Sequence, residues 1–213
     1  MILDIRKELI NAGLRLAEYK LITLTGGNVS YRNPDTNIVA ITPSGIEYKD
    51  LEADDIVLLD LDGNVVEGKR KPSSDTIAHL QIYRERKDIH SIIHTHSPYA
   101  SCFAILNEKV LVAQTTMANE IGGEVVVAEY APVGSDDFGL NVLKVLGDKK
   151  AILLKNHGVL AFGKDIKHAL TAAVMFEDTC KVYYLAKSIG QPVLLNEKQI
   201  EDANYIFQNI YGQ

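Results

Sequence analysis

Three histidines stand at positions that favour joint binding of a metal ion. His94-Thr95-His96 directly follows the apolar run 91–93, and His157 comes shortly after the apolar run 151–154. In an extended strand, residues i and i+2 point to the same side, so the first two imidazoles can reach one ion. Three histidine ligands with an open fourth position are typical of catalytic zinc. The pattern predicts a divalent-metal site, with one Zn²⁺ per chain on His94, His96 and His157.

The other histidines and the two cysteines have no such pattern. His79 falls in a predicted helix, His90 in a charged connector and His168 in a second predicted helix. Isolated histidines are common on partly exposed surfaces, so we expect all three to be solvated or locally hydrogen-bonded. Cys102 and Cys180 lie far apart in apolar or helical stretches. Both are predicted to be buried free thiols rather than parts of a disulfide framework.

Three short polar elements have the composition of an anion site: Gly26-Gly27-Asn28, Ser44-Gly45 and Ser73-Ser74. Glycine lets backbone N–H groups approach an anion, and a helix N-terminus adds a favourable dipole. Each element alone also fits an ordinary turn, because glycine and serine dominate turns. In combination they predict a phosphate site formed by Gly27, Asn28, Ser44, Gly45, Ser73 and Ser74.

Asp75 follows the serine pair at the predicted start of a helix. A carboxylate at that position normally complements the helix dipole. If it faces the metal instead, it becomes a candidate ligand or proton carrier. Both interpretations are compatible with the sequence.

Length and charge restrict the class of protein. With 213 residues and 46% apolar composition, the chain can bury one hydrophobic core, so a single domain over residues 1–213 is expected. The net charge of -6 argues against a nucleic-acid partner, and a phosphate ligand must be held locally. The sequence has neither a signal-peptide pattern nor an apolar run of about 20 residues. We therefore expect a cytoplasmic protein with no membrane partner.

The periodicity of apolar residues predicts an α/β fold. Apolar residues at helical spacing occur at the start of the chain, and runs rich in β-branched residues follow at 28–32, 38–41 and 56–61. Asp62-Gly63 is a predicted turn that leads into Val65-Val66. A helix is predicted from Ser73-Ser74 onward, with Ile77, Leu80 and Tyr83 on its inner side. Early hairpins favour a mixed or mainly antiparallel sheet. Further strands are expected at 91–93, 110–113, 125–128 and 151–154, and further helices at 98–106, 136–147, 165–188 and 197–210.

Taken together, five motifs resemble the class II aldolase and epimerase family, whose members act on sugars such as L-fuculose 1-phosphate and L-ribulose 5-phosphate. They occur in order along the chain: Gly26-Gly27-Asn28-Val29-Ser30, Thr42-Pro43-Ser44-Gly45, Lys71-Pro72-Ser73-Ser74-Asp75, His94-Thr95-His96 and Asn156-His157-Gly158. The resemblance implies a three-layer α/β/α fold, zinc on the three histidines and a phosphorylated sugar substrate. It further implies a homotetramer with active sites between subunits, each completed by Tyr211 of a neighbour.

The resemblance also bears on the reaction. Aldolases of the family typically have glutamate where Asp75 stands, whereas its epimerases have aspartate there. The epimerases, however, usually carry an aspartate acid/base after a Thr-Thr pair. Here Thr115-Thr116 is followed by Asn119, whose amide cannot cycle a proton. The compact stretch 120–157 is similar to the aldolase branch.

The balance of these features favours an aldolase. It would cleave L-fuculose 1-phosphate to dihydroxyacetone phosphate and L-lactaldehyde, with Asp75 and a neighbour's Tyr211 transferring protons. L-ribulose-5-phosphate 4-epimerase, a phosphosugar dehydratase or decarboxylase and a non-catalytic relative remain as alternatives.

Overall fold

A mixed sheet forms the centre of the molecule in the computed structural model, which describes residues 2–210. Within those residues eight strands lie in the order β4-β3-β2-β1-β5-β8-β7-β6. Neighbouring strands pair antiparallel, except β6 and β7, which pair parallel. The strands are β1 (Asn28–Arg32), β2 (Val39–Ile41), β3 (Val57–Leu59), β4 (Val65–Glu67), β5 (Ser91–Thr95), β6 (Val127–Ala128), β7 (Ala151–Leu154) and β8 (Gly158–Gly163).

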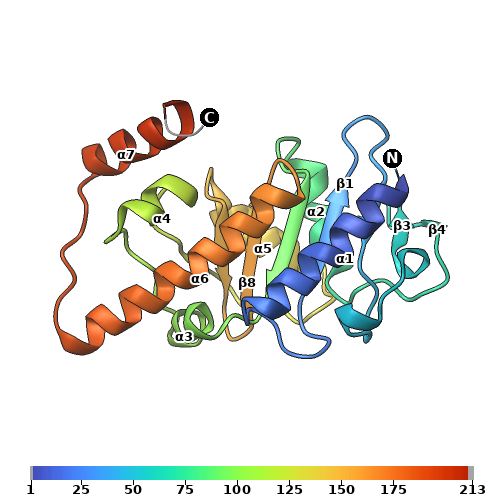
Figure 1. Ribbon diagram of the computed structural model, residues 1–213, viewed down its shortest axis with the longest axis horizontal. Helices are drawn as coiled ribbons and strands as arrows, with labels where there is room; N and C mark the ends of the chain where they lie inside the picture. Colours follow the sequence, from blue (N-terminus) through green and yellow to red (C-terminus); the bar gives the residue numbers. More distant parts are fainter. Residues whose placement is uncertain (1, 211–213) are drawn as a thin grey trace.

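Helices cover both faces of this sheet, which gives three layers (Figure 1). Because side chains alternate along a strand, Ile93 and Ile92 of β5 enter different apolar clusters. Ile93 packs on the side of α1 (Ile2–Glu18), α3 (Pro98–Leu106), α4 (Thr115–Glu120) and α6 (Ile166–Ile189). Ile92 packs on the side of α2 (Thr76–Glu85) and α5 (Asp137–Leu146). The predicted α/β/α fold with a mainly antiparallel sheet is confirmed.

The C-terminal helix α7 (Glu197–Asn209) lies beyond the sheet and packs against α4 (Figure 1). The Asn204 side chain donates to the carbonyls of Ala118 and Asn119, and Gln208 also donates to the Asn119 carbonyl. No helix among residues 2–210 has the length and apolarity needed to span a bilayer.

Several elements differ from the sequence-based expectation. The run 110–113 does not form a strand, since Val110 makes only an isolated bridge to Val125. Strand β8 and helix α4 were not predicted. The sequence of β8 is apolar on both sides because both faces of this strand are buried, so no alternation marks it. Helix α4 has only six residues, too few to establish a helical period.

Two predictions about individual side chains are wrong. Ile77, expected on the inner side of α2, is 39% exposed, whereas Leu80 and Tyr83 are buried as expected. Helix α2 begins at Thr76, two to three residues after the predicted serine pair, and its buried face is formed by other residues, including Ala78, His79 and Ile82. Cys102, expected to be buried, is exposed on α3, while Cys180 is buried.

Candidate metal and substrate site

The three histidines predicted to bind metal converge at one end of the sheet. His94 lies near the end of β5, His96 follows that strand, and His157 lies in the three-residue turn between β7 and β8. Strands β5 and β8 are neighbours, so the turn reaches the end of β5. Potential ligand atoms of the three side chains lie within 4.8 Å of one another. His94 and His96 point to the same side, with their Nε2 atoms 2.9 Å apart.

The backbone fixes the tautomer of His94. Its Nδ1 lies 2.9 Å from the carbonyl oxygen of Val159, which can only accept, so Nδ1 carries the hydrogen. The Nε2 lone pair therefore points toward the other two rings. A metal-binding histidine is commonly oriented by such a bond from its second nitrogen.

All three imidazoles favour the neutral form that a metal requires. Burial lowers the pKa of His94 to about 3, and it also lowers the pKa values of His96 and His157. The negative charge of Asp75 opposes this shift at each ring. Neutral imidazole nitrogens directed at one point are a donor set that suits Zn²⁺ and similar divalent ions. The residues present therefore fit the implied metal.

The turn that carries His157 has a shape that depends on its sequence. Asn156 has φ +57°, a left-handed conformation that asparagine tolerates better than most residues. Gly158 lies against the end of β5: a Cβ there would be 2.3 Å from the Thr95 carbonyl oxygen and 3.0 Å from His96 Cδ2. The glycine allows the two strands to approach closely enough for the histidines to meet.

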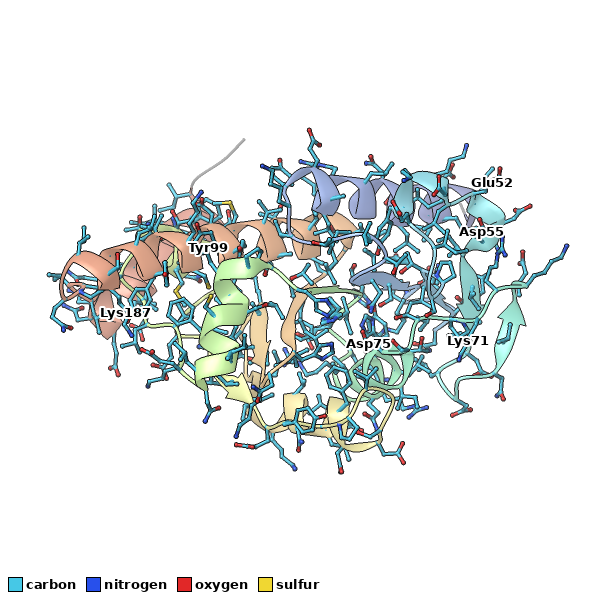
Figure 2. All side chains as sticks on the ribbon, turned by 90° about the horizontal axis from the view of Figure 1, so that it is seen from below. Glu52, Asp55, Lys71, Asp75, Tyr99 and Lys187 are labelled. Carbon is cyan, nitrogen blue, oxygen red and sulfur yellow. The ribbon has the colours of Figure 1, made fainter. Side chains whose placement is uncertain are left out.

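Asp75 faces the histidines rather than capping its helix. It is the N-cap residue of α2 but makes no side-chain capping bond. Its Oδ2 accepts a hydrogen bond from Asn28 Nδ2 at 2.6 Å and lies 3.7 Å from His94 Nε2. Its Oδ1 is buried and has no partner among the described residues. Figure 2 shows Asp75 in the interior of the molecule. Of the two interpretations left open by the sequence, the structure has the one in which the carboxylate faces the site.

The predicted phosphate residues line the same cavity as the histidines and Asp75. The cavity has a volume of about 270 Å³, and no lysine or arginine is among the described residues that line it. Its polar loops are tied together, because Ser44 N–H donates to the Lys71 carbonyl and Ser73 N–H to the Thr42 carbonyl. The remaining lining comes from Thr25, Gly26, Gly27, Asn28, Pro43, Gly45, Ser74 and Val133.

Some residues that line the cavity were not predicted from sequence, and one predicted residue lies outside the described part of the structure. Val133 lines the cavity from the connection between β6 and α5, where no sequence pattern distinguishes it from an ordinary loop residue. Tyr211, predicted to serve a neighbouring subunit, lies outside residues 2–210.

The histidines outside the cluster differ from one another. His168 is exposed and lies 2.7 Å from Asp165, and the half-buried His90 lies 3.2 Å from the Arg32 guanidinium, as expected for locally bonded side chains. His79 is fully buried, so of the two expected roles it has the hydrogen-bonded one and not the solvated one. Its Nδ1 lies 2.7 Å from the hydroxyl oxygen of Ser30, because α2 packs this residue against β1.

Comparisons with known proteins identify the family of the chain. The family model described as "Class II Aldolase and Adducin N-terminal domain" matches residues 7–184. A 5-deoxy-D-ribulose 1-phosphate aldolase of Bacillus thuringiensis serovar kurstaki is 40% identical over 208 residues, which cover 98% of this chain and 97% of that protein. A solved structure of L-fuculose 1-phosphate aldolase is 40% identical with a TM-score of 0.93, covering 96% of each chain. The L-fuculose-1-phosphate aldolase from Thermus thermophilus shares the fold at 24% identity and a TM-score of 0.74, covering 89% of this chain and 98% of that one.

Proposed function

Since the chain belongs to the class II aldolase family of lyases, we propose that it cleaves a ketose 1-phosphate to dihydroxyacetone phosphate and a short aldehyde. One observation carries the proposal. Three neutral histidines and a carboxylate with an unpartnered oxygen meet in one cavity with the hydroxyl-rich loops. This combination would bring a metal site, a proton-transfer group and neutral phosphate donors within reach of one small sugar.

The proposed roles follow from the geometry. A divalent ion on His94, His96 and His157 would supply Lewis-acid polarisation of the ketose carbonyl. When the bond between C3 and C4 breaks, C3 must gain a proton. Asp75 would carry that proton on Oδ1, the oxygen that has no partner among the described residues. Asn28 would hold the other carboxylate oxygen in place through its 2.6 Å hydrogen bond.

The proposed phosphate site uses neutral donors. Ser44, Ser73 and Ser74 line the cavity, and their hydroxyl groups would serve as donors. The backbone N–H groups of Gly45 and Ser74 donate to no other described residue, so they are free to meet an anion. Gly27 contributes by letting its backbone lie close to the end of β5: it has φ +76°, and a Cβ would lie 2.6 Å from the His94 carbonyl oxygen. Hydroxyl and amide donors of this kind bind phosphate without a local positive side chain.

The apolar part of the cavity points to the class of sugar. Among the described residues that line the cavity, and leaving the glycines aside, only Val133 and Pro43 have apolar side chains. Val133 is 49% exposed. An apolar side chain at the far end of the substrate would favour a methyl group there over a hydroxymethyl group. L-fuculose 1-phosphate and 5-deoxy-D-ribulose 1-phosphate, named for the two 40% identical relatives, both end in a methyl group. Cleavage would release L-lactaldehyde from the first and acetaldehyde from the second.

The position of Asn119 supports the aldolase over L-ribulose-5-phosphate 4-epimerase. Its side chain lies between α4 and α7, where the amide nitrogen, in its satisfied orientation, donates to the carbonyls of Thr115 and Ala203. It does not line the cavity formed by the described residues. An amide committed to helix packing is not an acid/base group for a second proton transfer.

We also propose that residues 1–213 act as one domain within a homotetramer. The described residues of α7 line no part of the cavity and instead pack on α4. A tyrosine supplied from beyond α7, such as Tyr211, would on this proposal serve the cavity of a neighbouring subunit. Light scattering of the purified protein tests the assembly, and a variant truncated after Gln208 tests the tail, with kcat expected to fall more than the melting temperature.

A substrate panel tests the proposed reaction. Zinc-loaded protein is incubated with L-fuculose 1-phosphate, 5-deoxy-D-ribulose 1-phosphate and L-ribulose 5-phosphate, and release of dihydroxyacetone phosphate is followed by a coupled dehydrogenase. Release from either deoxyketose should be abolished by His96→Ala. It should persist in His168→Ala, which removes an exposed histidine outside the cavity. Conversion of L-ribulose 5-phosphate to its epimer without triose release would contradict the proposal.

A further inference from the structure

A series of buried polar side chains joins β1 to α2 beside the site. Asn28, Ser30 and Arg32 alternate along β1 and face α2, because the intervening Val29 enters the cluster on the opposite side of the sheet. They meet positions 75, 79 and 83, which are four residues apart and share one face of the helical segment. We call these contacts the β1–α2 polar ladder.

The middle of the ladder is a hydrogen-bonded chain of three side chains. Ser30 Oγ lies 2.7 Å from His79 Nδ1 and 2.7 Å from the Tyr83 hydroxyl. Burial lowers the pKa of His79 to about 4, so its ring is neutral at pH 7. When the Tyr83 hydroxyl donates to Ser30, the Ser30 hydroxyl donates to His79 Nδ1. His79 then carries its hydrogen on Nε2, a buried atom with no partner among the described residues.

The two ends of the ladder fix the two ends of α2. At the far end, Arg32 donates from Nη1 to the Tyr83 carbonyl and from Nη2 to the carbonyls of Lys87 and Ile89. At the near end, Asn28 donates to the Asp75 carboxylate. The same strand therefore holds both the C-terminal end of α2 and the carboxylate that precedes it. Apolar packing alone allows a helix to shift along a sheet, whereas directional hydrogen bonds specify one alignment.

We propose that Ser30 and His79 are positioning residues that hold Asp75 at its place beside His94. The inference rests on the proposed function, in which Asp75 carries the proton for C3. Loss of the Ser30–His79 bond would let α2 adjust on the sheet, and a displacement of about 1 Å at a catalytic group can cost about a hundredfold in rate. Neither residue lines the cavity, so each acts through Asp75 rather than on the substrate.

Metal and phosphate binding should be largely independent of the ladder. The bond from His94 to Val159 joins β5 to β8, away from α2. The phosphate loops are tied through Ser44 N–H to the Lys71 carbonyl and Ser73 N–H to the Thr42 carbonyl, before α2 begins. A disturbed ladder should therefore lower kcat while zinc stoichiometry and inhibition by inorganic phosphate stay near wild type.

Three variants of the ladder and one control separate positioning from packing. His79→Leu and Ser30→Ala remove the bond, whereas His79→Asn keeps an amide group near the position of Nδ1. Leu80→Ala destabilises the same helix by opening a cavity but breaks no hydrogen bond of the ladder. We expect kcat to fall about tenfold to a hundredfold in His79→Leu and Ser30→Ala. It should be restored largely in His79→Asn and kept in Leu80→Ala despite a lower melting temperature.

Combination with Asp75→Asn tests whether the effect runs through the carboxylate. In that background His79→Leu should not lower the residual kcat further, because the carboxylate that His79 positions is gone. The proposal would be overturned if His79→Leu lowered kcat by the same factor with and without Asp75. It would also be overturned if His79→Leu had a higher kcat than His79→Asn.

Crystal structures of the metal-free variants give a readout that needs no activity. In His79→Leu the Asp75 carboxylate should leave its 2.6 Å bond to Asn28, and in His79→Asn it should keep it. A carboxylate that stays in place in His79→Leu would refute the positioning role. If the wild-type protein cleaves no ketose 1-phosphate, the proposed function fails, and the crystallographic comparison still decides whether Ser30 and His79 hold Asp75.

Discussion

Replacement of Gly158 by alanine should disrupt the metal site without removing any ligand. The added Cβ would lie 2.3 Å from the Thr95 carbonyl oxygen, 3.0 Å from His96 Cδ2 and 3.3 Å from His94 Cε1. Non-bonded carbon atoms are comfortable at about 3.5 Å from their neighbours. The turn or the end of β5 must therefore shift by about 1 Å, and both histidine rings adjoin the new atom.

The expected magnitude has two parts. Overpacking of a close-packed interior costs about 1–3 kcal/mol in the free energy of unfolding. Disturbance of ligand orientation lowers metal affinity by about tenfold to a hundredfold, as loss of an orienting contact does. The zinc affinity is measured by competition with a chromogenic chelator at pH 7.5, and the free energy of unfolding of the metal-free protein is measured in urea.

Gly190→Ala is the matched control. Gly190 follows α6, has an extended backbone with φ 177°, and has nothing within 4 Å of an added Cβ. Its zinc affinity and stability should equal those of the wild type. A Gly158→Ala protein that binds zinc as tightly as the Gly190→Ala protein would refute the view that close approach of β8 to β5 forms the site.

Three further predictions concern stability, pH and specificity. Arg32→Met leaves the carbonyls of Tyr83, Lys87 and Ile89 without their donor and should lower the free energy of unfolding in urea by about 3 kcal/mol; an unchanged midpoint would contradict this. Burial lowers the pKa of His79 to about 4, so between pH 6.5 and 4 the unfolded chain binds a proton that the folded chain does not. The metal-free protein should lose up to about 3 kcal/mol from this group as pH falls through that window, and His79→Asn should show a weaker decline in chemical unfolding. Val133→Thr should reduce the preference in kcat/KM for methyl-ended over hydroxymethyl-ended ketose 1-phosphates by about tenfold, and an unchanged ratio would remove Val133 from specificity.

The fold was largely predictable because long amphipathic helices and β-branched runs carry strong periodic signals. Strand β1 and helix α3 have the bounds that the sequence indicated. Strand β8 was not predicted, because its residues are apolar and buried on both faces and so do not alternate. Strand order is also absent from local patterns: β5 pairs with β1 and β8, which are distant from each other in the sequence.

The sequence indicated the histidines, Asp75 and the polar loops that line the cavity, but neither Val133 nor the three-dimensional arrangement of these residues. His94 and His96 were placed together by strand alternation, while the approach of His157 depends on the pairing of β5 with β8. The burial of His79 was missed because the sequence shows no partner for it. A signal was available, since His79 lies four residues after Asp75 and four before Tyr83 on one helical face. That face meets β1 only in the folded chain.

Hydrogen exchange into dihydroxyacetone phosphate tests the central claim most directly, because it requires no knowledge of the aldehyde. Zinc-loaded protein is mixed with dihydroxyacetone phosphate in D₂O, and the hydroxymethyl protons at C3 are followed by ¹H NMR. An aldolase with Asp75 as the proton carrier should exchange one of these two protons, and Asp75→Asn should stop the exchange while binding zinc normally. Absence of exchange in the zinc-loaded wild-type protein, or equal exchange in Asp75→Asn, would contradict the account.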